Sequence, residues 1–253
     1  MSRAVRRGSI PWFLGLGSDF FSRDAKTFPY LANSGVFALM KTLIAFLLLC
    51  CFSALVALSA EPQPGVAIAI VYDTSGSMSD PAVGADGKQR PKYQVASEAM
   101  RNIVSKIDDF SKTNTVEATL ITFRGPQVKI GPWNKGAFDK WLGEFRSPGG
   151  GTPLGEAILA ADKSLAASKL AKKHIVVLTD GVSTGDITPD AALRTIKKSP
   201  NAPRVYVVAF DVKSQVFDAV KREGSLVLPA TGASLDSGLT TLFGEKILLE
   251  NEE

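Results

Sequence analysis

The sequence contains few of the residues that build disulfides, soft-metal sites and nucleophilic active sites. Its 253 residues include two cysteines, Cys50 and Cys51, and one histidine, His174. Both cysteines lie in one apolar run, so a mature chain that has lost this run contains no disulfide. His174 begins the apolar stretch HIVVLT and is expected to be structural. Without it no Ser-His-Asp arrangement can form, which disfavours hydrolases of that kind.

An excess of positive charge is also missing from most of the chain. The formal net charge of +4 comes from residues 1–60, which carry six basic and two acidic side chains. The remaining 193 residues carry 23 of each sign. Nucleic-acid-binding proteins usually show a basic surface, so this partner class is excluded.

Residues 40–60 have the pattern of an export signal. Thr42 to Ala60 reads TLIAFLLLCCFSALVALSA, which is uncharged and preceded by Lys41. A positive start, an apolar middle and small residues at the end are typical of a secretory signal peptide. The alternative is a signal anchor, because nineteen residues of helix can just cross a bilayer core of about 30 Å. In both cases the following chain is exported, to the periplasm or the extracellular space, and contacts the membrane only through Thr42–Ala60 if this segment is retained.

The segments on either side of this signal show no periodicity typical of a helix or a strand. Residues 1–39 show no sustained periodicity, and we interpret them as an unstructured extension or as a mis-assigned start upstream of Met40. Residues 61–65 read as a short linker. Residues 66–250 then form one domain, without an internal repeat or a second linker.

Within this domain, apolar runs of strand type alternate with helix-periodic segments. The predicted strands are 66–72, 116–123, 127–130, 174–179, 205–210 and 225–228. The predicted helices are 92–110, 137–145, 154–171, 190–198, 215–222 and 235–249. This alternation predicts a doubly wound α/β fold with a mainly parallel sheet and one short antiparallel edge strand, residues 127–130.

Polar residues gather where these elements end. Asp73, Ser75 and Ser77 follow the first strand, Thr152 lies in GGGTPLGE before a helix, and Asp180 follows HIVVLT. Taken singly, each stretch also fits a turn or a helix cap. Together they provide only oxygen ligands at the sheet edge where such folds bind ligands. This set suits a hard divalent cation, Mg²⁺ first with Mn²⁺ and Ca²⁺ as alternatives, and disfavours Zn²⁺ and Cu²⁺.

The order D-x-S-x-S, then a threonine, then an aspartate resembles a von Willebrand factor A domain with a complete metal-ion-dependent adhesion site. The resemblance covers roughly residues 66–249 and implies a Rossmann-like fold. It also implies that the serines and the threonine contact the metal or its waters, whereas the aspartates act largely through water. It further implies a non-enzymatic module whose metal docks an acidic side chain of a protein partner.

Two other functions remain open at this point. The chain could be a structural subunit of an envelope assembly, in which the metal fixes one interface. A metal-dependent enzyme of the phosphoesterase type is less well supported. Ser75 stands where haloacid-dehalogenase phosphatases need a second acidic residue, and GGGTPLG lacks the Gly-Lys-Ser/Thr ending of a phosphate loop.

Overall fold

The computed structural model describes residues 62–249, and every structural statement below refers to them. The predicted signal segment, residues 40–60, and the upstream residues 1–39 lie outside this range. Within it, no helix is both long and apolar enough to span a bilayer. The first strand already begins at Gln63, inside the segment that was predicted to be a linker.

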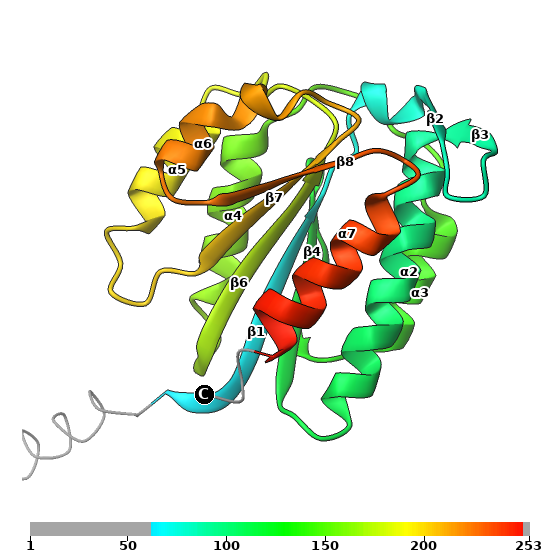
Figure 1. Ribbon diagram of the computed structural model, residues 1–253. Helices are drawn as coiled ribbons and strands as arrows, with labels where there is room; N and C mark the ends of the chain where they lie inside the picture. Colours follow the sequence, from blue (N-terminus) through cyan, green and yellow to red (C-terminus); the bar gives the residue numbers. More distant parts are fainter. Residues whose placement is uncertain (1–61, 250–253) are drawn as a thin grey trace, which may run out of the picture. The chain divides into compact units, whose positions relative to one another are not determined.

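The core of the domain is one six-stranded sheet in the order β5-β4-β1-β6-β7-β8 (Figure 1). The strands are β1 Gln63–Tyr72, β4 Val116–Thr122, β5 Gly125–Pro132, β6 Leu170–Thr179, β7 Arg204–Phe210 and β8 Leu226–Ala230. β5 pairs antiparallel with β4 at one edge, and every other neighbouring pair in this sheet is parallel. The predicted fold class, including the antiparallel edge strand, is confirmed.

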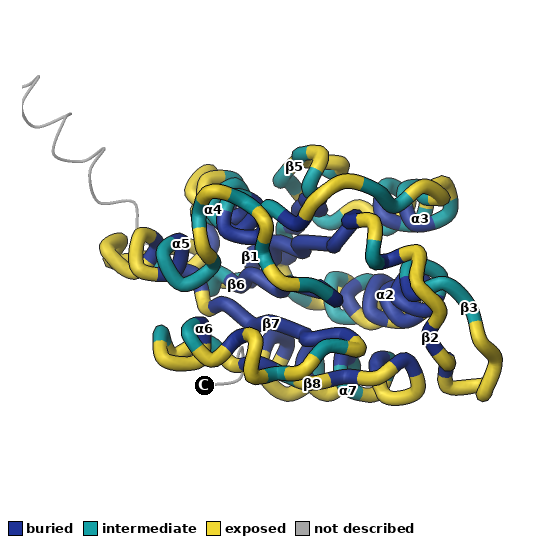
Figure 2. Tube along the Cα trace, turned by 90° about the horizontal axis from the view of Figure 1, so that it is seen from above, coloured by how far each residue is buried: buried dark blue, intermediate teal, exposed yellow. Residues whose placement is uncertain are grey.

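Helices cover both faces of this sheet (Figures 1 and 2). One face carries α2 Lys92–Ser111, α3 Lys135–Glu144 and α7 Leu235–Thr241, and the other carries α4 Leu154–Leu165, α5 Pro189–Ile196 and α6 Asp218–Arg222. Successive β1 residues alternate between the two cores: Ile68 and Ile70 pack on the α2 side, Ala67 and Ala69 on the α4 side. A strand buried on both faces has no polar positions, which explains the continuous apolar run.

Two predicted helix boundaries are wrong. The helix predicted over 154–171 ends at Leu165, and β6 begins at Leu170. The hydroxyl of Ser168 accepts a hydrogen bond from the amide of Leu170 at 3.1 Å, and Leu170 pairs with Gln63 in the sheet. This pairing overrides the helix propensity of the alanine-rich stretch. The last helix, predicted over 235–249, is α-helical only to Thr241 and continues as a π-helix, η3 Leu242–Leu248.

The connections out of β1 and β6 run to opposite faces of the sheet. β1 leads through a 3₁₀ turn, η1 Gly76–Ser79, and a small hairpin, β2 Pro81–Val83 and β3 Gln89–Pro91, to α2. β6 leads to α5 on the other face. Because β1 and β6 are adjacent, their carboxyl ends form the switch point at which doubly wound folds bind ligands.

Candidate metal centre

Asp73 leaves β1 beside the end of β6. Tyr72 is in register with Leu178, and the amide of Asp73 donates to the carbonyl of Leu178 at 3.0 Å. The carboxylate of Asp73 is fully buried. Its Oδ1 accepts from the Ser75 amide at 2.7 Å, and its Oδ2 accepts from the Thr179 hydroxyl at 2.6 Å and the Asp180 amide at 3.4 Å. Asp73 therefore ties the first loop of the site to the third.

The same burial changes the acidity of Asp73. Desolvation raises the pKa of this carboxyl, and the hydrogen bonds from Ser75 and Thr179 oppose the rise. The nearby charge of Asp180 adds to it. A cation bound close by would favour the ionised form, as bound metals do for acidic groups.

Ser75 and Ser77 continue from Asp73 toward Asp180. Their hydroxyl oxygens are 3.0 Å apart, and Ser77 Oγ donates to Asp180 Oδ1 at 2.7 Å. Ser75 is buried and Ser77 is partly exposed, so this row of oxygens runs from the interior toward solvent. The alternate residues of D-x-S-x-S thus converge, as the spacing predicts.

Thr152 lies on a loop that is fastened to the serine loop by two main-chain hydrogen bonds. The amide of Gly149 donates to the carbonyl of Thr74 at 2.8 Å, and the amide of Gly76 donates to the carbonyl of Gly150 at 3.1 Å. Gly150 has φ +88°, a left-handed conformation that glycine adopts without steric cost. The glycine run before Thr152 therefore allows its loop to follow the first one closely.

The hydroxyl of Thr152 faces the same space as Ser77. A methyl group placed on Gly181 would lie 3.5 Å from Thr152 Oγ1 and 3.8 Å from Ser77 Oγ, so both oxygens border this position. Thr152 does not cap the following helix: the N-cap residue of α4 is Pro153, which makes no side-chain cap. The structure thus brings all five predicted residues to one edge of the sheet.

Lys92, the first residue of α2, also reaches this edge, and the sequence did not point to it. Its ammonium donates to Asp180 Oδ2 at 2.8 Å. The Lys92 side chain is 11% exposed and the Asp180 side chain is fully buried, so the ion pair is largely removed from water. Both oxygens of Asp180 therefore have partners, a serine hydroxyl on one and an ammonium on the other.

Thr179 is a second contributor that the sequence analysis missed. Its hydroxyl donates to Asp73 and it immediately precedes Asp180. The pairing of two adjacent parallel strands would have revealed it, because the residue after Leu178 lies opposite the residue after Tyr72. No comparable signal exists for Lys92, whose partner lies 88 residues away in the chain.

The oxygen set fits a hard divalent cation by its chemistry. Three hydroxyls and two carboxylates lie at the switch point, and Mg²⁺, Mn²⁺ and Ca²⁺ prefer such ligands. Over residues 62–249, no group of three or more His, Cys, Asp or Glu side chains is arranged to hold a metal ion. A cation here would therefore depend on hydroxyl ligands, as the motif implies, and would share Asp180 with Lys92.

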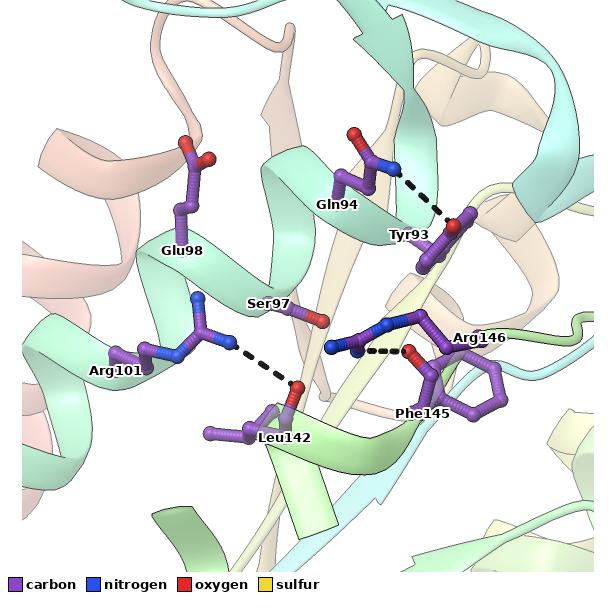
Figure 3. Close-up of a pocket in the computed structure, with 8 residues that line it drawn as sticks. All are labelled: Tyr93, Gln94, Ser97, Glu98, Arg101, Leu142, Phe145 and Arg146. Atoms are coloured by element: carbon purple, nitrogen blue, oxygen red, sulfur yellow. Dashed lines mark hydrogen bonds between the residues drawn. The ribbon is translucent and has the colours of Figure 1, made fainter. Parts of the chain in front are cut away.

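A pocket of about 240 Å³ lies next to this edge, between α2 and the end of α3 (Figure 3). Arg101 and Arg146 point into it beside the hydroxyl of Ser97. Each guanidinium donates to a main-chain carbonyl, Arg101 to Leu142 at 3.2 Å and Arg146 to Phe145 at 2.8 Å. The pocket begins at the residue after Lys92 and ends six residues before Thr152, so it adjoins two segments of the site.

Comparisons with known proteins identify the fold. Residues 68–183 match the family model of the von Willebrand factor type A domain. A comparison with curated proteins found no significant match. Among solved structures, the pilus adhesin SpaC from Lactobacillus rhamnosus GG has a TM-score of 0.61 at 17% identity, covering 76% of this chain and 31% of that one.

Two further solved structures have a similar fold. The D319A mutant of the PilB minor pilin from Streptococcus sanguinis has a TM-score of 0.56 at 16% identity, covering 74% of this chain and 62% of that one. The vWF domain of the type V pili tip protein Mfa5 from Porphyromonas gingivalis has a TM-score of 0.56 at 13% identity, covering 71% and 94%. The chain thus spans less than two thirds of the SpaC and PilB structures. It has the von Willebrand factor type A fold, with Asp73, Ser75, Ser77 and Asp180 after the carboxyl ends of β1 and β6 and Thr152 on the loop before α4.

Proposed function

We propose that this protein is an exported binding module that uses a divalent cation, Mg²⁺ in the first place, to dock an acidic side chain of a protein partner. Asp73, Ser75, Ser77, Thr152 and Asp180 would hold the cation. The observation that carries the proposal is the convergence of three hydroxyls and two carboxylates from three separate loops at the switch point of the sheet.

The way in which the carboxylates are engaged supports binding in preference to catalysis. Asp73 accepts hydrogen bonds from Ser75, Thr179 and Asp180, and Asp180 is shared between Ser77 and Lys92. Hydroxyls, which are neutral, are then the natural direct ligands. A cation held mainly by neutral ligands keeps much of its charge and attracts a carboxylate from outside.

The neighbouring pocket supports an acidic partner. Arg101 and Arg146, nine residues after Lys92 and six before Thr152, place two guanidinium groups in its lining beside one carboxylate, Glu98, and guanidinium groups bind carboxylates well.

Neither the chemistry nor the comparisons favour an enzyme. His174, the one histidine of the chain, lies in β6, six residues before Asp180, which corresponds to about 20 Å along an extended strand. The similar structures named above are described as a pilus adhesin, a minor pilin and a pilus tip protein. Together with the signal-like segment 40–60, these names support a location outside the cytoplasm.

The proposal is tested first by metal binding to the full chain. We expect Mn²⁺ and Mg²⁺ to bind at one site by isothermal titration calorimetry, and Ser75→Ala/Ser77→Ala to abolish this binding. Ser79→Ala is the matched control, because Ser79 is an exposed serine in the same 3₁₀ turn. Loss of binding in both variants would point to a general defect of the turn and count against direct serine ligands.

The second test is capture of partners from the native envelope fraction with and without chelator. We expect a partner that is retained by the wild type in Mg²⁺, released by chelator and not captured by Ser75→Ala/Ser77→Ala. Capture that is insensitive to both changes would favour a structural subunit. Metal-dependent turnover of a phosphoester would instead favour an enzyme.

A further inference from the structure

We propose that Lys92 is a built-in counter-cation of the metal centre, which weakens divalent-cation binding and keeps positive charge available for the partner's carboxylate. This inference rests on the proposed function, because it concerns the same site. It starts from one contact, the 2.8 Å ion pair between Lys92 Nζ and Asp180 Oδ2, whose partners are largely buried.

The position of Lys92 is unfavourable on local grounds. It is the first residue of α2, a twenty-residue helix with no side-chain cap and no acidic residue in its first turn. A cation at a helix N-terminus opposes the helix dipole, and burial adds a desolvation cost. Local rules are most often broken at functional sites, where another group compensates. Here Asp180 is the group that compensates.

Lys92 also connects parts of the site through its main chain. Its amide donates to the carbonyl of Asp80 at 2.8 Å, at the end of the loop that carries Ser75 and Ser77. Its side chain reaches the loop after β6. The ammonium is thus held at a defined place against Asp180, whose other carboxylate oxygen accepts from Ser77.

The charges of the site explain the effect. Asp73 and Asp180 together would neutralise a divalent cation by themselves. With the Lys92 ammonium present, the bound cation leaves one positive charge uncompensated, and a single carboxylate from the partner neutralises it. Lys92 therefore lowers the affinity of the site for the cation when no partner is present. It favours binding of the cation together with the partner's carboxylate.

A purely structural role for Lys92 makes a different prediction. An ion pair that only fixes α2 against β6 would lower the melting temperature when broken, without changing the affinity for metal. Removing Lys92 leaves the buried Asp180 carboxylate without its counter-charge, so both roles predict a lower melting temperature and only the metal affinity differs between them. The two roles are separated by measuring metal affinity and stability on the same variants.

The experiment is calorimetric titration of the full chain with Mn²⁺ and Mg²⁺ in four forms: wild type, Lys92→Met, Lys92→Gln and Lys88→Met. Lys92→Met removes the charge and keeps an apolar stem, and Lys92→Gln keeps a hydrogen-bond donor if the methionine variant folds poorly. Lys88→Met is the matched control, because it removes the same charge from the exposed β2–β3 hairpin. We expect both Lys92 variants to bind Mn²⁺ at least tenfold more tightly and the control to change less than twofold.

The outcomes separate this inference from the proposed function. Equal affinity in wild type and Lys92 variants would overturn the role of Lys92 and leave the metal site standing. Binding by the Lys92 variants but not by the wild type would support the counter-cation and contradict metal dependence of the native protein. Absence of binding in all forms would overturn both. The melting temperature, recorded with and without Mn²⁺, should rise more with metal in Lys92→Met than in the wild type.

Discussion

The two halves of the central sheet differ in the polar side chains that they bury, which are charged in one half and neutral in the other. At the carboxyl end, Asp73 and Asp180 are buried together with donors that compensate them, including the ammonium of Lys92. In the other half, His174 of β6 is buried and stacks on Tyr206 at 5.9 Å between ring centroids. Burial, with the nearby charges of Arg204 and Lys172, lowers the pKa of His174 to about 4.

This difference indicates which half of the sheet was built for function. The neutral imidazole of His174 carries no charge to compensate, and its Nδ1 lies 3.5 Å from the hydroxyl of Tyr206. Buried charges require partners with defined geometry, and they are retained at a cost in desolvation. The carboxyl end therefore holds an electrostatic arrangement that packing alone does not demand.

The largest effect is expected from breaking the charged pair. Asp180→Asn keeps the shape and the contact with Ser77 but removes the charge that balances Lys92. We expect the free energy of unfolding to fall by about 3–5 kcal/mol, because a buried ammonium is left without its carboxylate. Chemical denaturation measures this loss.

The double variant Asp180→Asn/Lys92→Met provides the control for that prediction. Removing both charges should recover a large part of the lost stability, as replacement of buried ion pairs by neutral groups often does. A double variant no more stable than Asp180→Asn would mean that Asp180 supports the fold through Ser77 and the loops, not through Lys92.

For the other half of the sheet, we expect His174 to make the free energy of unfolding depend on pH, with a somewhat smaller effect. The folded-state pKa of His174 is about 4, below its ordinary value of 6.5, so the unfolded chain takes up a proton first as the pH falls. The stabilising contribution is full above pH 6.5 and is lost progressively between pH 6.5 and 4. It amounts to about 3 kcal/mol, since each pKa unit corresponds to about 1.4 kcal/mol.

Urea denaturation of the wild type and His174→Leu, at several pH values from 7.5 to about 4, tests this. As the pH falls, the difference in the free energy of unfolding between the two proteins should change by about 3 kcal/mol in favour of the variant. The raised pKa of Asp73 acts in the opposite direction but is common to both proteins, so it cancels in the comparison. A difference in the free energy of unfolding that does not change with pH would show that His174 is not kept neutral.

The sequence predicts the sheet better than it predicts the charges around the site. Alternating apolar runs identify β1, β6 and β7, because strands buried on both faces admit few polar residues. Asp73 and Asp180 are recognisable because each follows such a strand directly. Lys92 is not, because a lysine that begins an amphipathic helix is normally solvated, and only the tertiary fold brings it to Asp180. The end of α4 was missed for a similar reason, since sheet pairing of Leu170 overrides local propensity.

The smallest effect on stability, and the sharpest contrast with Asp180, is expected for Thr152→Ala. The Thr152 amide donates to the Thr184 hydroxyl at 2.7 Å, and its carbonyl accepts from Thr184 and Leu154. These main-chain contacts survive the substitution, and the helix cap is Pro153, so the free energy of unfolding should change by less than about 0.5 kcal/mol. The lost hydroxyl borders Ser77 and the space beside Gly181, so metal-dependent capture of the partner should fall strongly while some Mn²⁺ affinity remains. Thr184→Val is the matched control: it disturbs the same loop and leaves the Thr152 hydroxyl in place. Undiminished capture by Thr152→Ala would mean that this hydroxyl takes no part in binding the cation or the partner.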